Sequence, residues 1–344
     1  MFLSFIDGLN MPIQILIFAV ALALGAFCLV KFCDIFLDSS STIAKKFKIS
    51  PLIIGLTVVA IGTSFPEFAV SVSDSVAVAM NGGNANIAFS NVVGSNLSNL
   101  LLVLSFSCLF APVIIKKASK RDYVVLTSIT LLLTLFALLF GNSEIKRWES
   151  IILVVLIFFY FAYIIFNVKR DNKDQLANEE KEDTKNIKIL KPILLVVLSI
   201  AGIALGGELV VYGAKGIALN ISDAFSIERN IAETLIGLTI VAVGTSLPEL
   251  VTTVIASKKG ENDMALGNVI GSNIFNIIFV LGTAGVIAPF SIASYMIIDL
   301  LVLVAATILV LVFVIKGKLN RKHSIILMSM YGLYLIYLIL RTIL

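Results

Sequence analysis

Long apolar runs follow one another along the chain and are separated by short polar connections. Many of these runs approach the roughly 20 residues that a helix needs to cross a bilayer. The runs are continuously apolar, which favours helices over barrel strands that would alternate at about 10-residue length. We therefore predict ten membrane-spanning helices, with approximate bounds of 11–37, 51–80, 85–111, 121–140, 150–167, 191–218, 231–257, 263–289, 295–316 and 323–342.

Composition supports a membrane protein. The chain has 344 residues, of which 59% are hydrophobic and only 14% are charged. A soluble protein of this size needs more polar surface than that. The net charge is +4, but the basic residues lie in the short connections between runs. The charge therefore gives no reason to expect a nucleic-acid partner.

The basic residues in the connections predict the orientation. Alternate connections collect most of the Lys and Arg, and the largest group lies between Lys169 and Lys191. Because cytoplasmic loops carry an excess of Lys and Arg, this side is predicted to be cytoplasmic. Both termini are then expected outside.

The only long polar segment divides the chain into related halves. We expect a first five-helix repeat over residues 1–168, a charged cytoplasmic linker over 169–190 and a second five-helix repeat over 191–344. "GTSFPE" from Gly62 matches "GTSLPE" from Gly244, and "NVVGSN" from Asn91 matches "NVIGSN" from Asn268. Since five is odd, the second half enters the membrane from the opposite side, which is the inverted-repeat arrangement typical of secondary transporters.

Each half places a proline inside a predicted span. Pro66 and Pro248 cannot donate a backbone hydrogen bond, and their rings clash with the carbonyls of Gly62 and Gly244. We expect both helices to break there and to release the carbonyls of the preceding residues, from Ala60 to Thr63 in the first half. Such backbone is tolerated at membrane depth only where protein or a water-filled cavity satisfies it.

The repeated motifs together offer an all-oxygen ligand set. Glu67 and Glu249 follow the two breaks, and a carboxylate within the membrane costs roughly 2.5–3.5 kcal/mol on insertion scales. Two matched carboxylates therefore ask for a functional explanation. Hard cations such as Ca²⁺, Na⁺ and Mg²⁺ prefer oxygen ligands. The neutral oxygens at matching positions belong to Thr63, Thr245, Ser95, Ser272, Asn99 and Asn276.

These motifs resemble the paired alpha repeats of the cation/calcium exchanger superfamily, and most of all its prokaryotic sodium/calcium exchanger branch. The resemblance covers almost the whole chain. It implies a Ca²⁺ site formed by Glu67, Glu249 and the carbonyls of Thr63 and Thr245. It implies Na⁺ sites that share these residues and add Ala60, Ser64, Ser95, Ala242, Ser246 and Ser272, with Asn99 and Asn276 as the central amides.

The resemblance implies an antiporter that exchanges Na⁺ for Ca²⁺ by alternating access, in the inner membrane of a prokaryote. A three-for-one stoichiometry would make it electrogenic. Potassium-dependent relatives carry Asp where this chain has Asn276, so we expect no K⁺ requirement. We expect no cofactor beyond the transported ions; the oligomeric state stays open.

Other functions remain as alternatives. The first is a Ca²⁺/H⁺ or other divalent-cation exchanger of the same fold. An ion channel is disfavoured by the duplicated inverted halves. An enzyme is not expected, because the single His and three Cys form no evident catalytic cluster.

Some ionisable residues have more than one interpretation. Asp74 lies seven residues after Glu67 and either guides ions along their access path or serves as a polar group at a helix end. Lys31, Asp34 and Glu208 are expected to form local pairs near the membrane surfaces.

Overall fold

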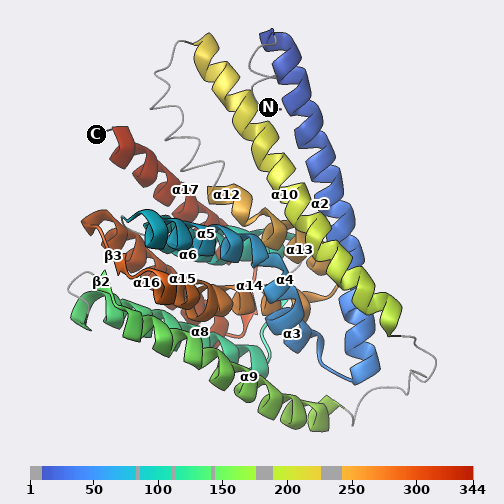
Figure 1. Ribbon diagram of the computed structural model, residues 1–344. Coiled ribbons are helices and arrows are strands. Elements are labelled where there is room, and N and C mark those ends of the chain that lie inside the picture. The colour runs from blue at the N-terminus through green and yellow to red at the C-terminus, as the bar shows by residue number, and fades with distance from the viewer. Residues whose placement is uncertain are drawn as a thin grey trace.

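The computed structural model is almost entirely helical (Figure 1). It describes residues 10–82, 86–110, 113–140, 144–175, 189–225 and 242–343. Within these ranges, 8 helices are long and apolar enough to cross a membrane, or 9 if a helix pair bent by 47° counts as one span. The start of the predicted span 231–257 lies outside the described residues.

The first half follows the predicted order of spans. Its elements are α2 (Met11–Phe47); α3 (Pro51–Ile54), η1 (Gly55–Val59), α4 (Ala60–Thr63) and α5 (Phe65–Asn81); α6 (Asn86–Ser98), η2 (Asn99–Val103) and α7 (Leu104–Phe110); α8 (Lys117–Leu135) and η3 (Phe136–Phe140); and α9 (Arg147–Gln175). The η elements are π-helical turns.

The second half repeats this order where it is described. Its elements are α10 (Leu190–Ala224); α12 (Ala242–Thr245) and α13 (Leu247–Lys258); α14 (Asn262–Phe275), the π-helical η6 (Asn276–Leu281) and α15 (Gly282–Ile287); α16 (Ser294–Ile315); and α17 (Arg321–Ile343).

Two helices are longer than their apolar runs. α2 continues ten residues past the predicted end at 37, and α9 continues to Gln175, into the predicted linker. α2 ends where Lys48 adopts a left-handed conformation with φ 54° and its N–H returns to the carbonyls of Ala44 and Lys45. Hydropathy therefore located the spans, while the helix ends depend on capping geometry.

α2 and α10 form a long antiparallel pair on one side of the molecule (Figure 1). Glycines line their contact. A Cβ added at Gly206 would lie 2.8 Å from the Leu29 nitrogen and 3.1 Å from the Gly25 oxygen. Small residues let two backbones approach closely, which is how helices associate where lipid removes the hydrophobic driving force.

Two short strand pairs join connections of opposite halves, and sequence analysis did not predict them. β1 (Val113–Ile114) pairs with β4 (Lys318–Leu319), and β2 (Glu144–Ile145) pairs with β3 (Phe290–Ser291). β1 and β3 follow the matching prolines Pro112 and Pro289. Each pair therefore ties a first-half connection to a second-half one.

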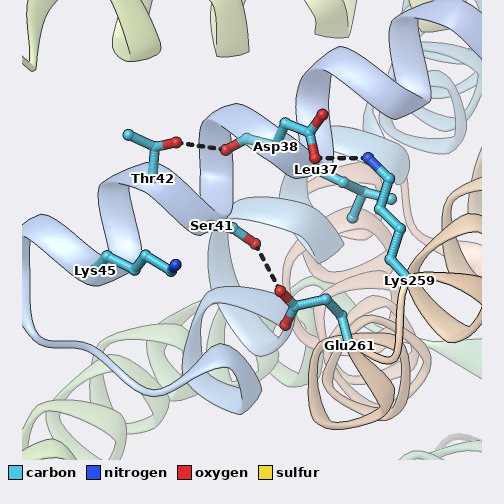
Figure 2. A pocket seen from close by; sticks show the side chains of 7 residues that line it. All are labelled: Leu37, Asp38, Ser41, Thr42, Lys45, Lys259 and Glu261. Carbon is cyan, nitrogen blue, oxygen red and sulfur yellow. Dashed lines mark hydrogen bonds and ion pairs between the residues drawn. The ribbon is translucent and has the colours of Figure 1, made fainter. Parts of the chain in front are cut away.

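An ion-pair cluster connects α2 to the turn between α13 and α14, and Figure 2 shows part of it. The Lys259 ammonium lies 2.6 Å from carboxylate oxygens of both Asp34 and Asp38, and Ser41 donates to Glu261 at 3.3 Å. Partial burial acts to lower the pKa of Lys259, but its hydrogen bonds to the two aspartates raise that pKa above its ordinary value. A cavity of about 320 Å³ opens beside this cluster.

The glycine contact can be tested by adding one methyl group. Gly206→Ala places a Cβ against backbone that cannot rotate away, so we expect the free energy of unfolding in detergent to fall by about 1–3 kcal/mol. Gly332→Ala is the matched control, because its Cβ would meet nothing within 4 Å. Equal unfolding free energies for the two variants would contradict a close backbone contact between α2 and α10.

Candidate ion-binding site

The two predicted helix breaks have the same geometry. The helix in the first half is interrupted at Ser64, with φ −83° and ψ 8°, and that in the second half at Ser246, with φ −86° and ψ 3°. Pro66 and Pro248 each follow two residues later, in the first turn of α5 and α13. The expected break at each proline is therefore confirmed.

The carbonyls before the first break are less free than expected. The Ala60 oxygen still accepts the Ser64 N–H at 3.0 Å, and the hydroxyls of Thr63 and Ser272 approach it at 3.4 and 3.5 Å. The prediction that this carbonyl is released was therefore wrong. Its contacts with two hydroxyls nevertheless direct it toward the other polar groups. In the second half, Ala242 begins α12.

The two motif glutamates are fully buried, and serines hold one oxygen of each. The Ser64 hydroxyl donates to Glu249 Oε1 at 3.1 Å, across the two halves. The Ser95 hydroxyl donates to Glu67 Oε1 at 3.3 Å, within the first half. Among the described residues, Glu67 Oε2 and Glu249 Oε2 have no hydrogen-bond partner.

Two hydroxyl contacts relate the halves by pseudo-symmetry. Thr63 Oγ1 lies 3.4 Å from Ser272 Oγ, and Ser95 Oγ lies 3.4 Å from Thr245 Oγ1. Thr63 is the counterpart of Thr245, and Ser272 is the counterpart of Ser95. The two contacts are therefore equivalent in the two halves. Each pair therefore joins a motif residue of one half to a motif residue of the other half.

A second matched pair of contacts involves Asn91 and Asn268, two residues for which no role was predicted. The Asn91 amide donates to Ser71 Oγ at 3.0 Å, and the Asn268 amide donates to Thr253 Oγ1 at 3.0 Å. Each joins the helix after a break to the next helix of the same half. Asn91 and Asn268 open the second repeated motif, so the repeat itself was a signal for them.

Each central amide begins a π-helical turn. Asn99 starts η2 and Asn276 starts η6, at equivalent places in the two halves. π-helical turns are rare and occur frequently at functional sites. Both asparagines are fully buried, and neither Asn99 amide atom has a partner among the described residues.

The site can hold a hard cation. It brings two carboxylates together with hydroxyl, amide and carbonyl oxygens, and no three His, Cys, Asp or Glu side chains of the described chain gather into a metal-binding group. Buried polar atoms without partners cost roughly 1–3 kcal/mol each, and more when charged. The motif atoms without partners among the described residues include Glu67 Oε2, Glu249 Oε2, Asn99 Oδ1, Asn276 Oδ1 and Ser246 Oγ, and a bound cation would satisfy those within its reach.

The remaining ionisable residues lie elsewhere. Asp74 accepts the backbone N–H of Ala88 at 3.0 Å, which makes it a polar group at the start of α6. Asp34 pairs with Lys259. The expected local pairing is thus confirmed for Asp34, whereas Lys31 and Glu208 are exposed on α2 and α10 and no ion pair joins these two described residues.

The comparison with protein families decides the identity. The model of the family described as "Sodium/calcium exchanger protein" matches residues 17–169 and 191–340. The chain belongs to the sodium/calcium exchanger family. The exchanger is an integral membrane protein and a cation/calcium antiporter of the prokaryotic branch.

Individual relatives align with most of the exchanger's length. The sodium/calcium exchanger MaX1 of Methanosarcina acetivorans is 34% identical over 359 residues, which is 92% of this chain and 97% of that protein. Inner membrane protein YrbG of Escherichia coli is 34% identical over 276 residues, covering 78% and 79%. A structure of the sodium-calcium exchanger NCX_Mj, soaked with Na⁺ and Sr²⁺, aligns with a TM-score of 0.75 at 30% identity and covers 93% of this chain and 98% of that one.

The glutamates provide the direct test of this site. Glu67→Gln and Glu249→Gln each replace one of the two buried carboxyl groups by a neutral amide that cannot supply a negative charge to Ca²⁺, so we expect Ca²⁺ uptake into proteoliposomes to fall at least about tenfold. Asp74→Asn is the control, because an amide oxygen can still accept the Ala88 N–H. Near-normal uptake by either glutamate variant would contradict the site.

Proposed function

We propose that the protein exchanges Na⁺ for Ca²⁺ by alternating access and moves Ca²⁺ out of a prokaryotic cell. The observation that carries this proposal is the pair of buried glutamates, each with one oxygen held by a serine and the other without a partner among the described residues. Two negative charges balance one Ca²⁺. The similarity to the sodium/calcium exchangers MaX1 and NCX_Mj supports the choice of ions.

The ligands are assigned as follows in this proposal. Ca²⁺ binds Glu67, Glu249 and the carbonyls of Thr63 and Thr245. Na⁺ occupies overlapping positions that share these residues, so the two ions compete, and competition at one site is the basis of exchange. The further Na⁺ ligands are Ala60, Ser64, Ser95, Ala242, Ser246 and Ser272.

We propose that the protein has ten spans in two inverted repeats, 1–168 and 191–344, which are joined by the linker 169–190. This architecture underlies the proposed alternating access. The matched breaks at Ser64 and Ser246 support the duplication. The β1–β4 and β2–β3 pairs also support it, since they exchange when the halves exchange. The repeats allow one site to open to either side of the membrane.

A Ca²⁺/H⁺ exchanger of the same fold is the alternative, and ion gradients separate the two. In proteoliposomes we expect an outward Na⁺ gradient to drive Ca²⁺ uptake, while a pH gradient alone drives none. With three Na⁺ leaving for each Ca²⁺, an inside-positive potential should speed uptake.

Potassium tests the role of Asn276 in the same assay. Removing K⁺ should leave uptake by the parent unchanged, whereas Asn276→Asp adds a third negative charge and should make K⁺ stimulate uptake. Uptake driven only by the pH gradient, or a strict K⁺ requirement in the parent, would overturn the assignment.

The proposed orientation places both termini outside and the linker in the cytoplasm. In a background where Cys28, Cys33 and Cys108 are replaced by Ala, Ser4→Cys should react with an impermeant thiol reagent on intact cells. Thr184→Cys should react only after the membrane is opened, because the Lys-rich connections favour the cytoplasm. Labelling of Thr184→Cys from outside would show that the linker is extracellular and would contradict the proposed orientation.

A further inference from the structure

The amide of Asn96 connects the two halves beside the candidate site. It is fully buried on α6, one residue after Ser95, and it had no assigned role. Its Nδ2 donates to the backbone carbonyl of Asn273 at 3.1 Å, and its Oδ1 accepts from Asn276 Nδ2 at 3.1 Å. The side chain therefore contacts the end of α14 twice, across the boundary between the repeats.

These two hydrogen bonds determine which way the Asn276 amide points. A backbone carbonyl can only accept, so Asn96 must turn its NH₂ group toward Asn273. Its oxygen then faces Asn276, which must supply a donor. The Asn276 NH₂ is thereby held against Asn96, and its Oδ1 is left at the other end of the amide, buried and without a partner among the described residues.

The free oxygen of Asn276 belongs to the site. Asn276 lies four residues after Ser272, so both side chains project from the same face of the helix. Ser272 itself contacts Thr63 Oγ1 at 3.4 Å. A cation next to these groups meets the acceptor end of the amide, whereas a reversed amide would present an NH₂ group that repels it.

We propose that Asn96 is a positioning residue that orients Asn276, so that a neutral carbonyl oxygen faces the transported Ca²⁺. This inference rests on the proposed function, since it concerns the same ion. Asn96 does not itself bind the ion. It acts only by orienting Asn276. Its counterpart in the other half, Asn273, does not orient an amide in this way.

The other half shows the contrast. Asn273 is the counterpart of Asn96, and Asn99 is the counterpart of Asn276. The Asn273 amide donates to the Val269 carbonyl in its own helix at 2.7 Å instead of turning to Asn99. Within the described ranges Asn99 has no partner on either amide atom. Orientation by a neighbouring amide is thus a property of one repeat, which supplies a matched control.

A double-mutant cycle with equilibrium ⁴⁵Ca²⁺ binding to the purified full-length protein tests the proposal. Asn96→Leu removes the orienting contacts, and we expect the Kd for Ca²⁺ to rise about fivefold. In the Asn276→Ala background the same change should have no further effect, because the group that Asn96 orients is gone. The control cycle of Asn273→Leu with Asn99→Ala should be additive.

Equal effects of Asn96→Leu on the Kd in the parent and in the Asn276→Ala background overturn the proposal, because a purely structural role of Asn96 would not depend on Asn276. If Asn96→Leu misfolds on gel filtration, Asn96→Ala replaces it, and failure of both to fold assigns Asn96 a structural role and also overturns it. A parent that binds Ca²⁺ without Na⁺-driven uptake overturns the Na⁺/Ca²⁺ assignment alone, and a parent that binds no Ca²⁺ overturns both.

Discussion

Two carboxylates buried in an apolar helical bundle are the constraint on which the rest of the structure depends. A buried charge needs either an opposite charge or several hydrogen bonds. Glu67 and Glu249 each receive a serine hydroxyl, while the ion pairs of the described residues are made by other side chains. The broken helices and the hydroxyls of Ser64 and Ser95 bring polar groups to these two carboxylates.

Local sequence effects were predictable, and contacts between the halves were not. Pro66 and Pro248 break their helices because a proline disturbs its own turn whatever surrounds it, so both breaks could be located from the sequence. The spans that the structure describes followed from hydropathy. By contrast, the contact of Asn96 with Asn276 depends on how the two repeats meet, and no local pattern encodes that.

The site also departs from perfect symmetry. Ser64 reaches Glu249 in the other half, but its counterpart Ser246 has no hydrogen-bond partner in the described part of the chain. A duplicated sequence supplies equivalent residues, yet one conformation of a transporter cannot treat its two sides alike if it opens toward only one of them. The unequal environments of Ser64 and Ser246 fit the inverted-repeat arrangement that we propose, because any single state of such a transporter opens toward one side.

The π-helical turns at Asn99 and Asn276 have a geometric consequence for each helix. A wide turn accommodates an additional residue, and one residue of an α-helix corresponds to a rotation of about 100°. The stripe of side chains that the helix presents on one side before the turn therefore does not continue along the same side after it. Each helix can present oxygen ligands in one part and apolar packing in the next without twisting its axis, so a helical wheel drawn across either asparagine assigns the wrong face to everything beyond it.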